Sequence, residues 1–568
     1  LDGKPLSLNG LTNSTPEYLK DFFSSKPVIA TYNNAAPSTP TNAMTWLELY
    51  PQNKYVDSQG RSYMSVGVAM NWNGEKMGIS AMNGENIIGR TTTRNEDGSW
   101  EYGPAIADET SLEGRNFQQQ WDRAIAEDVD FVFVTGWNEW LAGRHRNWGD
   151  AGAGTVLESA IVDTYDAEYS RDIEPSTGIL KDAYYTQLVT NIRNFKGQNA
   201  IPQEDTARTM TVDGEFDDWK DAMTYETYAN DVEDRDFLGR GSHSYTNTSG
   251  RNDIVLAKTA VDEKYVFFYA ETADDMTGMT DGSFMQLYIN ADRDGETGWE
   301  GYDFLLNGVE PNEYYMTLQR HAGDGYSWTE CAKVAYRIVG NRLEVAIPRS
   351  ALGLTEDYVN LEFKWMDNII DADAPDIMDV YTQGDAAPGS RFNYVFKTTE
   401  TMEYPEAPVQ DPITAFDVTV TVENGSWTGE ATAEVLKDYT VTFRVNKGYA
   451  LPAEVTVQLN NEVLPADLYQ YDPATGILVI PAEKIIGDLT IHAVCTALPP
   501  DSGSGSSSGS SSSSSTDNGS ASDTGSSSAA SQPSTPQTGD PGSVTLYTLL
   551  LVISLSGLAV LVYRRRRA

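Results

Sequence analysis

The residues with the clearest chemical potential follow an apolar run, FVFVT at 131–135. Such a run of β-branched and aromatic residues is typical of a buried parallel strand, whose carboxyl end is where barrel enzymes carry their chemistry. The tetrad WNEW follows, with Glu139 between Trp137 and Trp140 and next to Asn138. Flanking rings desolvate a carboxylate, which suits Glu139 to proton transfer or nucleophilic attack at a glycosidic bond. We therefore predict that Glu139 is catalytic and that its three neighbours contact the sugar.

Glycosidases generally use two carboxyl groups, so Glu139 needs a partner. The next acidic stretch, DTYDAEYSRDIEP at 163–175, offers Glu168, Asp166 and Asp172, and the sequence does not choose among them. The alternative is that Glu139 is a structural carboxylate paired with a neighbouring cation such as Arg144.

Residues 1–197 alternate short apolar runs with helix-like stretches, the pattern of βα units around a parallel barrel. The predicted strands are 5–8, 44–49, 63–70, 131–135 and 159–164, and the predicted helices are 117–126 and 182–195. Five strands cannot close an eight-stranded barrel, so the expected fold is a partial (β/α)8 barrel.

WNEW, the acidic-Pro pair at 174–175, GRNF at 114–117 and the stretch from DAYY at 182–185 to 197 resemble glycoside hydrolase barrels of families 71 and 99. The resemblance covers about the last half of such a barrel. It implies hydrolysis of O-glycosyl bonds when the barrel is complete, with no cofactor needed for catalysis, and it leaves open that this fragment is inactive.

Residues 205–398 are strand-dominated. The pieces VDGEFDDW (212–219), NDIVLAK (252–258), DRDGETGW (292–299) and FKW (363–365) resemble the family 9 carbohydrate-binding module, a β-sandwich. Sugar rings need aromatic platforms with polar groups beside them, and the candidates are Trp299, Trp328 and Trp365, each of which could equally be core. Asp292, Asp294 and Asp303 have the alternating spacing that suits a structural calcium ion, or they form a solvated acidic turn.

Residues 412–496 alternate with period two and resemble small Ig-like or repeat stalk modules. Residues 500–535 form a Ser/Gly-rich spacer that cannot bury a core.

The segment 536–568 contains PQTGD, an apolar run at 544–563 long enough to cross a bilayer, and four arginines that hold the end in the cytoplasm. This order resembles a sortase cell-wall sorting signal, which implies cleavage between Thr538 and Gly539 and attachment to peptidoglycan. Thr535 replaces the family's leading Leu, and a plain single-pass anchor is the alternative.

Composition excludes some partners. The formal charge of −43, from 40 basic and 83 acidic residues, repels nucleic-acid backbones. Cys331 and Cys495 fall in different predicted domains, so we expect free, buried thiols. The four histidines show no zinc spacing, and no Gly-rich phosphate loop stands out.

The sequence thus favours an extracellular, wall-anchored glycoside hydrolase with an appended carbohydrate-binding module. Its partners would be a polysaccharide or glycan, sortase, peptidoglycan and, before processing, the membrane around the C-terminal helix. The alternative is a non-catalytic surface adhesin that binds glycans, and a glycosyltransferase-associated barrel fits an exported chain poorly.

Overall fold

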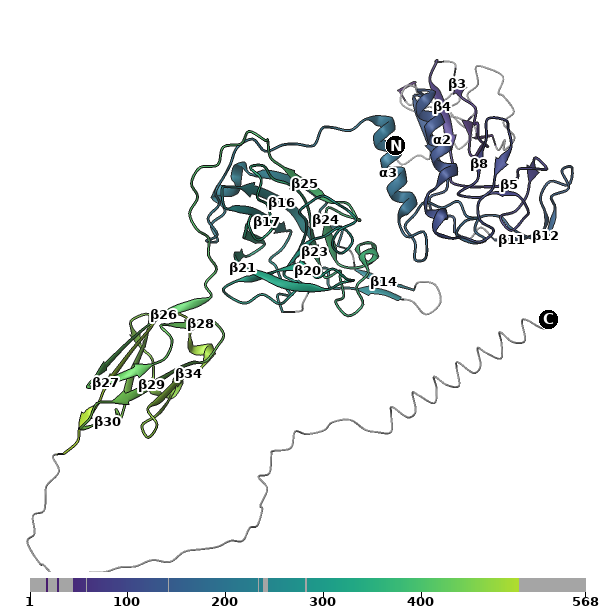
Figure 1. Ribbon diagram of the computed structural model, residues 1–568. Helices are drawn as coiled ribbons and strands as arrows, with labels where there is room; N and C mark the ends of the chain where they lie inside the picture. The colour runs from purple at the N-terminus through teal and green to yellow at the C-terminus, as the bar shows by residue number, and fades with distance from the viewer. Residues whose placement is uncertain are drawn as a thin grey trace, which may run out of the picture. The chain divides into compact units, whose positions relative to one another are not determined.

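The computed structural model describes residues 17–18, 28–29, 44–57, 59–140, 143–232, 234–238, 244–280 and 283–499. Strands make up most of the regular structure. Two α-helices have their bounds in this part of the chain, α2 (Arg115–Ala126) and α3 (Ala183–Lys196) (Figure 1).

The N-terminal region contains one βαβ unit made of β4 (Ser62–Val66), α2 and β10 (Phe131–Val134). β10 pairs with β4 in parallel, with Val134 opposite Val66. Helix α2 begins after Gly114, whose φ of +57° is a left-handed conformation that glycine adopts without strain. Its residues Phe117 and Trp121 lie one turn apart on one face and pack into a core with Met64 of β4.

The barrel prediction is wrong, because the described strands of this region are mostly antiparallel and pair in small separate sheets. β3 (Tyr55–Val56) pairs antiparallel with β4, and β5 (Met70–Asn73) pairs antiparallel with β6 (Gly78–Ile79) and β7 (Ile87–Ile88). β11 (Arg144–Trp148) and β12 (Leu157–Ile161) form a hairpin. The remaining short pairs are β1 (Val28–Ile29) with β2 (Met44–Thr45), in parallel, and β8 (Thr93–Arg94) with β9 (Trp100–Glu101).

The apolar run at 131–135 predicts a buried parallel strand, and this prediction is wrong about burial. Among the described strands, β10 has β4 as its one partner, so it is an edge strand, and Phe131 is 54% exposed. A barrel strand would be paired on both sides and covered on both faces. The predicted strand at 63–70 is split between β4 and β5, and the one at 159–164 overlaps an arm of the β11–β12 hairpin. The predicted strand at 5–8 lies outside the described residues.

The second region is an antiparallel sheet of eleven strands that folds over its own core (Figure 1). The spatial order is β13-β16-β17-β22-β21-β20-β19-β18-β23-β24, and β25 also pairs with β23. Phe268 of β17 and Phe363 of β23 are far apart in this order, yet their ring centroids lie 5.4 Å apart, so the two halves face each other as in a sandwich. The strands are β13 (Met223–Glu226), β16 (Ile254–Val261), β17 (Tyr265–Thr272), β18 (Gln286–Asn290), β19 (Phe304–Leu306), β20 (Met316–His321), β21 (Trp328–Val339), β22 (Arg342–Pro348), β23 (Asn360–Asp367), β24 (Asp385–Ala387) and β25 (Tyr394–Lys397), with a hairpin of β14 (Arg235–Leu238) and β15 (Ser244–Asn247).

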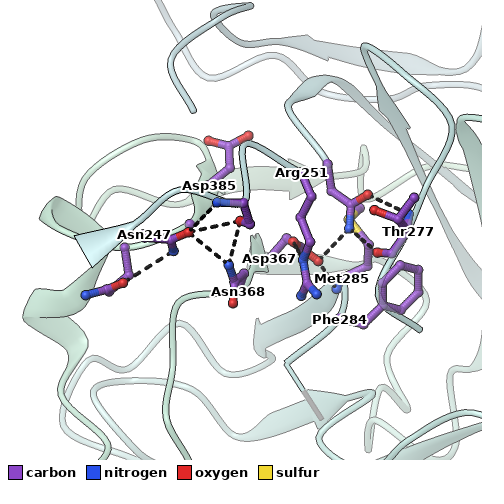
Figure 2. A network of polar contacts seen from close by, with 12 residues as sticks. Asn247, Arg251, Thr277, Phe284, Met285, Asp367, Asn368 and Asp385 are labelled. Carbon is purple, nitrogen blue, oxygen red and sulfur yellow. Dashed lines mark hydrogen bonds and ion pairs between the residues drawn. The ribbon is translucent and has the colours of Figure 1, made fainter. Parts of the chain in front are cut away.

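A buried carboxylate ties the sandwich together. Asp367, at the end of β23, is fully buried and accepts hydrogen bonds from Arg251 Nε (2.8 Å), Asn252 Nδ2 (2.9 Å) and the Met285 N–H (2.8 Å) (Figure 2). Burial raises its pKa, whereas Arg251 and these donors oppose that rise. Three segments that are distant in sequence are therefore joined at one side chain.

The third region packs two sheets around Val441, Leu478 and Ile491. One sheet has the order β28-β26-β35-β31-β32 and the other β27-β29-β34-β33. Their strands are β26 (Ala415–Glu423), β27 (Gly425–Thr428), β28 (Thr432–Glu434), β29 (Tyr439–Val445), β31 (Val455–Leu459), β32 (Glu462–Val463), β33 (Gln470–Asp472), β34 (Ile477–Ile480) and β35 (Leu489–Val494), and β30 (Tyr449–Ala450) pairs with β36 (Thr496–Ala497). Cys495 is buried as expected, but Cys331 is exposed.

The spacer, Thr535, the Thr538–Gly539 bond and the apolar run at 544–563 lie outside the described residues. Within the residues that are described, none of the helices has both the length and the apolar character needed to cross a membrane.

Candidate functional site

Glu139 lies on a small cavity of about 140 Å³, called here the Glu139 hollow. Its lining includes two tryptophans, one from the WNEW tetrad and one from an earlier loop, and two acidic residues. The residues that matter for chemistry are Trp46, Trp137, Asn138, Glu139, Arg171 and Asp172. The hollow therefore brings three residues of the tetrad together with the acidic stretch that follows β12, and Trp140 does not line it.

Local backbone contacts explain why the tetrad faces this acidic stretch. β10 ends at Val134, and Gly136 then turns the chain with a φ of +82°. A Cβ at Gly136 would come within 2.4 Å of the Arg171 carbonyl oxygen, so only glycine permits this approach. The carbonyl of Trp137 accepts hydrogen bonds from the N–H groups of Ile173 (3.1 Å) and Glu174 (2.9 Å). The two segments are thus held together by main-chain bonds.

Asp172 is the second carboxylate in the hollow. It is 1% exposed, and one of its oxygens, Oδ1, accepts a hydrogen bond of 2.5 Å from the Glu139 N–H. The other oxygen, Oδ2, is buried and has no hydrogen-bond partner among the described residues. Burial raises the pKa of Asp172, although the Glu139 N–H, Arg90 and Arg171 oppose the rise. Asp172 therefore retains a proton to higher pH than a solvated aspartate does.

Arg171 supplies the positive charge beside Glu139. Its Nη2 lies 3.8 Å from Glu139 Oε2, and its guanidinium forms an ion pair with the buried Asp163 and lies 5.2 Å from the ring of Trp46. The alternative pairing with Arg144 is not seen, because Arg144 Nε donates to Ser159 Oγ across the β11–β12 hairpin. The Glu139 side chain is 58% exposed, so its flanking tryptophans do not bury it.

The other two acidic candidates lie elsewhere. Glu168 is fully buried and accepts hydrogen bonds from Thr91 N (2.9 Å), Thr91 Oγ1 (2.8 Å) and Ser111 Oγ (2.7 Å), which is the environment of a structural carboxylate. Asp166 accepts bonds from the N–H groups of Tyr169 (2.8 Å) and Ala107 (3.2 Å). Neither residue lines the Glu139 hollow.

Of the remaining tetrad residues, Trp140 and Asn138 contact the acidic stretch at Glu174. Trp140 Nε1 donates to Glu174 Oε2 at 2.9 Å, and Asn138 Nδ2 lies 3.4 Å from Glu174 Oε1. Trp137 is 46% exposed, so its ring is open to a ligand.

In the sandwich, the structure places the three candidate tryptophans in or against packed clusters. Trp365 is fully buried on β23, and Trp299 is 8% exposed and packs edge-on against Tyr326 at 4.8 Å. Trp328 is partly buried beside the same tyrosine. As placed, Trp365 offers no face to a sugar.

The predicted calcium ligands are only partly brought together. Asp292 and Asp303 share a hollow of about 310 Å³ with Arg320 and His321, whereas Asp294 turns its carboxylate to the Glu296 N–H at 2.9 Å. Calcium binding here stays a prediction. The described residues contain one group of three acidic side chains with ligand atoms within 4.8 Å of one another, and it lies elsewhere, at Asp231, Asp253 and Asp385.

Asp385 lies at the start of β24 (Figure 2). Among these three carboxyl groups it has the pKa that is shifted most. It is 6% exposed and accepts bonds of 2.7 Å from the N–H groups of Ile254 and Ala386. Burial, helped by the charges of Asp231 and Asp253, raises its pKa from 3.8 to about 7. Sequence reasoning missed this group because its members come from three separate segments.

This raised pKa predicts a pH-dependent stability. Below about pH 4, Asp385 is protonated in the folded and unfolded chains alike, and as the pH rises to about 7 the unfolded chain loses the proton first. The free energy of unfolding should therefore fall over this window, and Asp385→Asn should remove that part of the fall. Thermal unfolding of both chains at several pH values measures this, and parallel pH profiles would contradict it.

Comparison with known protein families finds no family model that matches this chain. A comparison with curated protein sequences likewise finds no match.

Proposed function

We propose that the N-terminal region hydrolyses glycosidic bonds at the Glu139 hollow. The observation that carries the proposal is that Glu139 and Asp172 line one cavity together with two tryptophans. Paired carboxyl groups in different environments, next to aromatic faces, are what glycoside hydrolysis requires.

The two environments suggest separate roles. The raised pKa of Asp172 favours the protonated form, so a carboxyl group on the wall of the hollow suits donation of a proton to the leaving oxygen. Glu139 is open to solvent and lies near Arg171, so its carboxylate suits attack on the anomeric carbon or activation of a water molecule. Trp46 and Trp137 would contact the sugar ring.

The rest of the chain is proposed to hold this activity at a glycan surface. The sandwich would bind the polymer, and the tail would attach the chain to peptidoglycan through Thr538 after sortase cleavage. Joining a binding module to a catalytic one raises the effective concentration of substrate.

The test is release of new reducing ends from a polysaccharide panel by the purified full chain. We expect release from at least one polymer, with saturation at high substrate concentration. Binding of a polymer without any release across the panel would contradict hydrolysis.

One observation favours the adhesin as a second candidate. The Glu139 hollow, at about 140 Å³, is smaller than the roughly 300–1,000 Å³ of common ligand pockets. It would accept a single terminal sugar more readily than a chain. On the same panel, binding of a polymer without release of reducing ends would identify the adhesin.

A further inference from the structure

We propose that the chain has a second glycan site besides the Glu139 hollow, located in the sandwich in a hollow around Asp385 and selective for saccharides with a free amino group. This inference deepens the proposed glycan-directed function by naming the ligand class of the sandwich. The site, called here the Asp385 hollow, is lined by Tyr228, Asp231, Arg235, Asp385, Phe392 and Tyr394.

Separate segments converge on this hollow. Asp385 begins β24 and Tyr394 begins β25, and both strands pair with β23. Tyr228 and Asp231 come from the segment after β13, and Arg235 begins β14. Because rigid strands supply Asp385 and Tyr394, this part of the hollow is preorganised.

The charges in and around the hollow are mostly negative. Asp385, Asp231 and the adjacent Asp253 bring carboxylate oxygens within 4.8 Å of one another, and Glu226 also lines the hollow. Repulsion among such carboxylates is relieved when a cation binds between them.

Two cationic side chains lie near these carboxylates. Arg235 Nη1 lies 3.3 Å from the Gly384 carbonyl. Lys364 is fully buried and donates to the carbonyls of Pro388 and Phe392, and burial lowers its pKa from 10.5 to about 7. Lys364 and Asp385, each with a pKa of about 7, are both only partly charged at neutral pH, so their charges largely offset each other. The acidic side chains of Asp231 and Glu226 then leave the hollow with a negative balance.

Aromatic rings make the hollow suitable for an organic cation on a sugar. Tyr228 is 82% exposed, and Phe392 and Tyr394 are partly buried. Tyr394 is supported from behind by Tyr225, with ring centroids 4.8 Å apart. Aromatic faces attract ammonium groups and stack on pyranose rings, whereas a hydrated metal ion gains nothing from stacking. An amino sugar uses both the rings and the carboxylates.

The experiment measures binding by calorimetry to two disaccharides that differ only in one amino group, free in the first and N-acetylated in the second. A single amine limits non-specific attraction to this acidic chain, and the Glu139→Gln chain prevents turnover. With EDTA and physiological salt, we expect the free amine to bind about tenfold more tightly, or about 1.4 kcal/mol. Equal affinity for the two disaccharides would overturn the proposal.

Two variants locate the binding. Asp231→Asn and Tyr228→Ala change exposed side chains and should each weaken binding of the amine about tenfold. The matched controls, Asp221→Asn and Tyr358→Ala, change exposed residues elsewhere in the sandwich and should leave it unchanged. Insensitivity to Asp231→Asn, or binding that needs added calcium, would overturn the proposal.

The outcome is separable from that of the hydrolysis test. Asp231→Asn should not change the release of reducing ends from a soluble substrate by the chain with Glu139 intact. Failure of amine binding with hydrolysis intact would remove only the second site, and absence of hydrolysis with amine binding intact would remove only the enzymatic proposal.

Discussion

Glu139→Gln is expected to lower the rate of reducing-end release by roughly 10³-fold, with little change in KM. Glutamine has nearly the same size, and the backbone N–H that bonds Asp172 is kept, so the loop should hold its shape. The amide can neither attack the anomeric carbon nor accept a proton from water, and loss of such a group typically costs roughly 10²–10⁴ in rate. Initial rates on the polymer found by the panel measure the effect.

The matched control is Glu158→Gln. Glu158 is exposed on β12, outside the Glu139 hollow, and the same chemical change there should leave kcat unaltered. Full activity of the Glu139→Gln chain would remove Glu139 from the reaction. An equal loss in both variants would point to impurity or misfolding instead.

The helices were predictable because their signals are local. The predicted helices at 117–126 and 182–195 agree with α2 and α3, since a helix needs only its own apolar face and a suitable start such as Gly114. Strand pairing is not local in this way. The run at 131–135 looks the same whether a strand has one partner or two, and so the edge position of β10 could not be foreseen.

The candidate site could likewise be predicted only in part, because the sequence shows local patterns but not the contacts between distant segments. Glu139 follows the apolar run and lines the Glu139 hollow, whereas its catalytic role stays a prediction. The choice among Glu168, Asp166 and Asp172 depended on the path of a loop, and Gly136 is the residue that brings Asp172 close. Trp299 lies in a polar loop, and this local pattern does not indicate that its ring packs against Tyr326.

Asp367→Ala is expected to destabilise the sandwich by about 3–5 kcal/mol, the usual cost of removing one partner from a buried ion pair. The substitution removes the acceptor of the Met285 N–H and the carboxylate partner of Arg251 Nε (Figure 2). It also removes one of the two acceptors of Asn252 Nδ2, which keeps its bond to the Thr277 carbonyl. The unfolding transition of the sandwich in urea, followed by the fluorescence of its buried tryptophans, should therefore move to a lower midpoint.

Asp367→Asn separates charge from hydrogen bonding at the same position. Its Oδ1 can still accept from Asn252 and Met285, while the attraction to Arg251 is lost, so we expect a loss smaller than that of Asp367→Ala. Asp373→Ala, at an exposed residue in the loop after β23, should leave the midpoint within the range of ordinary surface changes, about 0.5 kcal/mol. If Asp367→Ala behaved like Asp373→Ala, the network would not stabilise the sandwich, and the convergence of three segments on Asp367 would be a consequence of the fold rather than one of its causes.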